Sequence, residues 1–187
     1  MFKNLLLLGL AWGVLVSSGF ANRWIWIHGT LEDPVKQAEY MKFTDQLISY
    51  YSKRVAAISK ISEETSRIKK YPADFTMVWC GPIQAFRHFE ETGLPVELKE
   101  NELILAGKSF PQPRTGLFLS LEGGKRLLYT GLSYQGFNDI FTIPTGQRQC
   151  TIMEQGRKTW EGDFVNGVLK LSAHSFLPVF PGVNNLE

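Results

Sequence analysis

Residues 23–34 read RWIWIHGTLEDP and contain the signals that decide the fold of this chain. Large apolar side chains occupy both sides of the strand alternation from Trp24 to Ile27, which is typical of a strand buried on both faces. Asp33 followed by Pro34 is a strong helix start, because Asp accepts hydrogen bonds from free N–H groups and Pro suits the first helical position. These signals predict a buried strand, a turn and then a helix.

The same order of strand and helix recurs through the first half of the chain. A second strand is expected at RVAAI (54–58), and a short helix at SEETSRIKK (62–70). A third, buried strand is expected at DFTMVWCG (74–81), and a helix at PIQAFRHFEETG (82–93) that ends at its glycine. The pattern predicts a three-layer α/β fold with a mixed, mainly parallel sheet and helices on both faces, doubly wound in the Rossmann or flavodoxin manner.

The second half of the chain changes to hairpin signals. GLFLSLEGGKRLLYTG (116–131) predicts a hairpin that turns at its two adjacent glycines, and QCTIMEQGRKTWEGDF (149–164) predicts another around Gln155-Gly156. SYQGFNDIF (133–141) is compatible with one short helix between them. We therefore expect a single α/β domain over residues 22–165, followed by a strap and tail over residues 166–187.

The N-terminal segment has the features of a secretory signal peptide. Lys3 supplies a positive start, residues 5–16 form a short apolar run, and small residues precede a cleavage position after Ala21. Residues 1–21 are therefore predicted to be removed, so that the mature chain begins at Asn22 and is periplasmic or secreted. The alternative is an uncleaved N-terminal anchor, for which the apolar run is short.

The composition and motifs of the sequence limit the kinds of partner, metal and cofactor that the protein could bind. The chain has 20 basic and 18 acidic residues, a balance that argues against a nucleic-acid groove and against a membrane surface beyond the signal peptide. Cys80 and Cys150 both lie in apolar, strand-like contexts, which predicts two buried free thiols. The sequence contains no zinc-type Cys/His spacing, no P-loop and no G-x-G-x-x-G fingerprint, so we expect neither a metal nor a cofactor.

The segment IHGTLEDPV (27–35) resembles the acid-bearing loop of prolyl-oligopeptidase-type α/β-hydrolases. The resemblance implies that Glu32 or Asp33 orients a catalytic histidine. Such an enzyme also needs a nucleophile on a strand-to-helix turn earlier in the chain, yet the sequence has no G-x-S-x-G, and Ser133 comes later. A hydrolase of the esterase or peptidase class with a non-standard or degenerate site, using His28, Glu32 or Asp33, and Ser133, is therefore the alternative hypothesis.

A second resemblance covers residues 24–164 and is strongest at LPVELKENELILAGKSF (94–110). Here the chain resembles the α/β domain found C-terminally in some secreted bacterial prolyl-oligopeptidase-like proteins. It departs from that pattern at WCGPIQAF (79–86), where an expected Asn is absent. The resemblance implies an exported, non-catalytic binding or accessory module of a peptidase- or glycan-related system. Its ligand would be a small molecule, a peptide or a partner protein.

Ligands of open α/β sheets bind where the strands reach their carboxyl ends. Candidate ligand-binding residues at that edge follow the predicted strands and are His28, Gly29, Thr30, Gly81 and Ser133. The structural interpretation of the same region assigns positioning roles to His28 and Glu32, and assigns Asp33 to the cap of the following helix.

Overall fold

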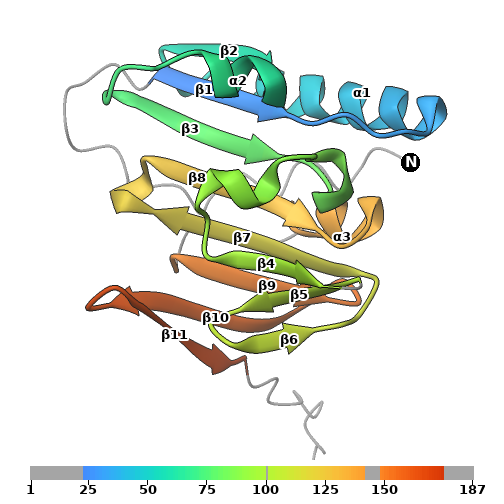
Figure 1. The fold of residues 1–187 in the computed structure, drawn as a ribbon, viewed down its shortest axis with the longest axis vertical. Helices are drawn as coiled ribbons and strands as arrows, with labels where there is room; N and C mark the ends of the chain where they lie inside the picture. Colours follow the sequence, from blue (N-terminus) through green and yellow to red (C-terminus); the bar gives the residue numbers. More distant parts are fainter. Residues whose placement is uncertain (1–22, 100, 142–147, 175–187) are drawn as a thin grey trace, which may run out of the picture.

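The computed structural model describes residues 23–99, 101–141 and 148–174. They form an eight-stranded sheet in the order β11-β10-β9-β7-β8-β3-β1-β2 and a three-stranded sheet in the order β4-β5-β6 (Figure 1). The expected signal peptide and its cleavage site lie outside the described residues.

The bounds of the elements follow the chain. The strands of the large sheet are β1 (Arg23–His28), β2 (Ala57–Ser62), β3 (Phe75–Cys80), β7 (Thr115–Leu121), β8 (Arg126–Gly131), β9 (Cys150–Glu154), β10 (Arg157–Val165) and β11 (Val168–Ala173). The small sheet consists of β4 (Val96–Lys99), β5 (Glu102–Leu105) and β6 (Lys108–Phe110). The helices are α1 (Pro34–Tyr51), α2 (Glu63–Ile68) and α3 (Tyr134–Asp139), with short 3-10 turns at η2 (Ile83–Ala85), η3 (Phe89–Thr92) and η4 (Glu122–Gly124).

Strand β1 lies between β2 and β3 and runs parallel to both. Its four central residues, Trp24 to Ile27, are each at most 5% exposed, which confirms the prediction that both faces of this strand are buried. Trp24 and Trp26 pack on the side of α1, whereas Ile25 and Ile27 pack against the opposite core. The two cores explain why the alternation of this strand has no polar side.

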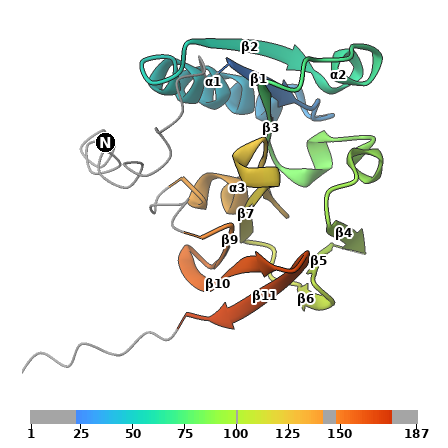
Figure 2. The same ribbon diagram turned by 90° about the vertical axis from the view of Figure 1, so that its left-hand side faces the viewer.

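The prediction of helices on both faces of the sheet is wrong. Helices α1 and α3 lie on one face, and the other face is covered mainly by the η2–η3 segment and the small sheet (Figure 2). The helix expected over residues 82–93 is replaced by η2 and η3. Its backbone is diverted because the buried Glu63 carboxylate accepts the N–H groups of Arg87 and His88, which a continuous helix would use internally.

The prediction of a mainly parallel sheet is also wrong. Strands β2, β1, β3 and β8 are mutually parallel, but β8, β7, β9, β10 and β11 are joined by antiparallel pairings. The physical reason is the length of the connections, since tight turns can join only antiparallel neighbours and a parallel pair needs a crossover. The β7–β8 connection turns through Gly123 and Gly124, both with positive φ, and the β9–β10 connection turns at Gln155-Gly156. Both hairpins and helix α3 confirm the sequence-based expectations.

Part of the segment expected to be a strap belongs to the sheet. Residues 168–173 form β11, which pairs in register with β10 from Val168 opposite Val165 to Ala173 opposite Trp160. Residues 175–187, the rest of the expected strap and tail, lie outside the described part of the chain.

Both cysteines are free and buried, as predicted. Cys80 packs in the core beneath α1, together with Trp26 and Tyr40, whereas Cys150 packs in the core on the opposite face, together with Leu117. The sheet therefore separates the two thiols.

Within the described ranges, none of the helices combines the length and the apolar character that crossing a membrane would need.

Candidate functional site at the carboxyl edge of β1

The start of α1 is closed by side chains of the chain itself. Asp33 is the N-cap of α1, and its Oδ1 accepts the backbone N–H groups of Val35 at 2.9 Å and Lys36 at 3.2 Å. The N–H group of Leu31 donates to Gln37 Oε1 at 2.7 Å. The predicted capping role of Asp33 is confirmed, and it leaves these helix-start N–H groups engaged rather than available to a ligand.

The crossover point between β1 and β3 is filled by backbone. The chain leaves β1 toward β2 on one side and returns to β3 on the other, which is the position where open α/β sheets usually form a ligand crevice. Here the η2 turn occupies it, because Thr30 N donates to Ala85 O at 2.7 Å. A Cβ at Gly29 would lie 2.0 Å from the same oxygen, so this contact requires glycine.

Tyr40 closes the crossover point from the opposite side. Its hydroxyl accepts the buried N–H group of Gly29 at 3.3 Å and donates to Cys80 O at 2.5 Å, so one side chain of α1 links the ends of β1 and β3. A Cβ at Gly81 would lie 2.4 Å from the same hydroxyl. Burial is the main reason that the pKa of Tyr40 is raised well above its usual value, which keeps the hydroxyl protonated as a donor. Gly29 and Gly81 are therefore packing residues.

The three catalytic candidates His28, Glu32 and Ser133 do not form a catalytic group. Ser133 is the N-cap of α3 and its Oγ accepts the N–H group of Gly136 at 3.1 Å. His28 is half-buried and its Nδ1 lies 3.2 Å from Gly29 O. Glu32 is exposed. In the part of the chain that the structure describes, no hydrogen bond or ion pair joins any two of these three residues.

An open groove of about 490 Å³ lies beside this closed edge. It is lined by Thr30, Leu31, Glu32, Asp33, Lys36, Gln84 and Arg87. Of the ligand-binding candidates, only Thr30 lines it. Lys36, Gln84 and Arg87 were missed from the sequence. A signal was present, because Gln84 and Arg87 follow β3 at the same edge, but the wrong helix expectation for residues 82–93 concealed their position.

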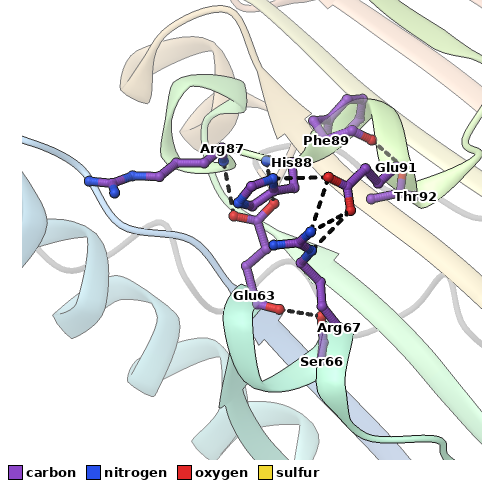
Figure 3. A network of polar contacts seen from close by, with 8 residues as sticks. All are labelled: Glu63, Ser66, Arg67, Arg87, His88, Phe89, Glu91 and Thr92. Atoms are coloured by element: carbon purple, nitrogen blue, oxygen red, sulfur yellow. Dashed lines mark hydrogen bonds and ion pairs between the residues drawn. The ribbon is translucent and has the colours of Figure 1, made fainter.

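The wall of the groove that carries Arg87 is held by a buried carboxylate (Figure 3). Glu63, 3% exposed, accepts the backbone N–H groups of Arg87 and His88 at 2.9 Å each. Beside it, the Arg67 guanidinium makes two hydrogen bonds to the Glu91 carboxylate, at 2.9 and 3.1 Å, and His88 Nδ1 lies 3.1 Å from the same carboxylate. Thus α2 and the η2–η3 segment are joined by a polar network, and the backbone of Arg87 is fixed.

Some charged side chains of the groove have an ion-pair partner among the described residues and others do not. The Lys36 ammonium lies 3.8 Å from the Asp33 carboxylate, so these two charges form an ion pair that is exposed to solvent. Glu32 and Arg87 are exposed, and neither side chain makes a hydrogen bond or an ion pair with any described residue. A hydrogen bond from its own backbone N–H is the largest cause of the lowered pKa of Glu64; a hydrogen bond with Ser62 and the nearby positive charge of Arg87 contribute less.

No three His, Cys, Asp or Glu residues among those described gather closely enough to hold a metal ion. Comparison with known proteins finds no matching family model, no matching curated protein and no matching solved structure. The resemblance to the prolyl-oligopeptidase-associated domain stays a prediction from the sequence.

Proposed function

We propose that this protein is a non-catalytic binding module that captures its ligand in the groove beside β1. The observation that carries the proposal is the packing of Ala85 O against Gly29 and Thr30. This contact fills the crossover point of the sheet with backbone and leaves a shallow, open surface with exposed charges beside it. Such a surface suits reversible binding.

The engagement of the potentially reactive groups supports the same proposal. General acid–base and nucleophilic catalysis need a nucleophile and a base within hydrogen-bond reach, usually where water is excluded. The Ser133 hydroxyl and the Asp33 carboxylate instead accept backbone N–H groups at the starts of two helices. The proposed role in the cell follows the sequence resemblance and is that of an exported accessory component of a peptidase- or glycan-related system.

The proposal is tested by titrating the ¹⁵N-labelled protein with short peptides and with glycan fragments while recording amide chemical shifts. We expect at least one class of ligand to shift resonances of residues 30–36 and 84–87 in a saturable manner. Arg157, exposed on β10, offers a matched control, because Arg157→Gln removes a cation separated from β1 by four strands of the sheet and should leave binding unchanged.

The enzymatic alternative is tested in parallel by assaying the protein with a panel of ester and peptide substrates. Wild-type protein should turn over neither ester nor peptide substrates. Turnover that is removed by His28→Ala, or by Ser133→Asn, which keeps a capping side chain at the start of α3, without loss of stability would overturn the binding-module proposal and make this edge an active site.

A further inference from the structure

We infer that the groove recognises a short peptide by its terminal carboxylate, which the Arg87 guanidinium binds. The inference rests on the proposed function and names the chemical class of its ligand. Its evidence is the exposed Arg87 guanidinium, whose donors have no partner among the described residues, the fixed position of its backbone, and the polar lining of the groove.

Arg87 is the groove cation whose guanidinium donors have no hydrogen-bond or ion-pair partner among the described residues; its charge acts on the nearby Glu64 carboxylate without direct contact. Its side chain is exposed and makes no hydrogen bond or ion pair within residues 23–99, 101–141 and 148–174, whereas Lys36 shares its charge with Asp33. A guanidinium presents a planar fork of donors that matches the two oxygens of a carboxylate. The backbone N–H groups of Val35 and Lys36 already donate to Asp33, so an anion in the groove depends on side chains rather than on the helix start.

The backbone of Arg87 is held in place before a ligand arrives. The buried Glu63 carboxylate holds the N–H groups of Arg87 and His88, and the Arg67–Glu91 pair joins the same segment to α2. Figure 3 shows the Arg87 side chain directed away from this network, on the opposite side from Glu91. A fixed backbone reduces the conformational entropy lost on binding, so Glu63 acts as a positioning residue for the carboxylate contact.

The remaining groups of the groove complement a peptide better than a glycan. No aromatic side chain lines the groove, so a sugar ring would find no ring on which to stack. Gln84 Nε2 donates to Leu132 O, which leaves its amide oxygen as an acceptor for a peptide N–H. The exposed Glu32 supplies the opposite charge for an ammonium group.

The probes are tri-alanine with a free carboxylate, its C-terminal amide, and amidated Ala-Asp-Ala, which carries a carboxylate only on its side chain. Affinities are measured by amide shifts and by calorimetry. We expect tri-alanine to bind roughly tenfold or more tightly than its amide, the ratio expected from a charge-assisted hydrogen bond. Amidated Ala-Asp-Ala should bind no more tightly than the amide of tri-alanine.

Three variants test which residues cause the preference for the free carboxylate. Arg87→Gln removes the guanidinium and keeps the backbone N–H that Glu63 accepts, so it should abolish the preference for the free acid while leaving the unfolding midpoint unchanged. Glu63→Gln should weaken tri-alanine binding, and Arg157→Gln should not.

The outcomes separate this inference from the proposed function. Groove shifts with equal affinity for acid and amide, tight binding of amidated Ala-Asp-Ala, or binding of glycan fragments alone would each overturn the carboxylate inference and leave the binding module standing. A preference for the free acid that survives Arg87→Gln would also overturn it. Absence of groove shifts with every peptide and glycan would overturn the proposed function itself.

Discussion

Replacing Tyr40 with Phe removes one hydroxyl from between the ends of β1 and β3 and keeps the aromatic ring. The ring packs edge-on against Phe137 at 5.9 Å between centroids, so the substitution leaves this contact in place. What is lost is one hydrogen bond from Gly29 N–H and one to Cys80 O, both in a buried setting. Tyr40 itself is 0% exposed, so water cannot readily replace the missing group.

The expected cost follows from these two bonds. A buried polar group left without its partner costs about 1–3 kcal/mol, and the 3.3 Å bond from Gly29 is the weaker of the two. We therefore expect Tyr40→Phe to lower the free energy of unfolding by about 2–3 kcal/mol. The N–H group of Thr30, which donates to Ala85 O, should also exchange faster with solvent, because Tyr40 supports the packed crossover point.

Urea unfolding followed by tryptophan fluorescence measures the loss, and amide hydrogen exchange measures the local loosening. Tyr134→Phe is the matched control, because the Tyr134 hydroxyl makes no hydrogen bond among the residues described and its ring packs near Phe137. The control should change stability by less than about 0.5 kcal/mol. A loss for Tyr40→Phe as small as that of the control would refute the conclusion that this hydroxyl links the two strands.

Three further predictions concern the cap, alkaline pH and the thiols. Asp33→Ala should lower the free energy of unfolding by about 0.5–2 kcal/mol in thermal or urea unfolding, because it removes the N-cap of α1. Asp33→Asn should leave the free energy of unfolding nearly unchanged, since Asn also caps helices. Equal losses for the two variants would show that the negative charge of Asp33 stabilises the protein rather than its capping hydrogen bonds. Burial raises the pKa of Tyr51 to about 12 and that of Cys150 to about 12. The unfolded chain loses these protons at lower pH than the folded protein. The free energy of unfolding should therefore keep its full value below about pH 8.5 and fall as the pH rises to 12, with a loss of roughly 2–3 kcal/mol from Tyr51 alone. Urea unfolding in reducing buffer measures this loss, and a free energy of unfolding that stays constant from pH 8 to 12 would contradict the prediction. Cys80 and Cys150 should resist a thiol reagent in the native protein and both react after unfolding without reductant, and a mass two hydrogens lighter would instead indicate a disulfide.

The candidate site could be predicted from the sequence only in part. The sequence located the edge of the sheet after β1 and the capping role of Asp33, because both depend on neighbours within a few residues. It missed Arg87 and Gln84, since the apolar spacing of Ile83, Phe86 and Phe89 fits a helix as well as it fits two 3-10 turns. The choice between them depends on Glu63, which lies 24 residues before Arg87.

The sequence by itself determined the features whose causes are local: the buried strand from Trp24 to Ile27, the helix starts at Asp33 and Ser62, and the turns at Gly123-Gly124 and Gln155-Gly156. Tertiary structure alone decided how these elements are layered. The small sheet, rather than helices, covers the second face, because Val96, Leu103, Leu105 and Phe110 become buried only against strands distant in the chain. Tertiary structure also decided whether the carboxyl edge of β1 is open to a ligand. A glycine after a parallel strand is compatible with either a bound ligand or a packed backbone, and here Ala85 O, brought there by the η2 turn, takes the space.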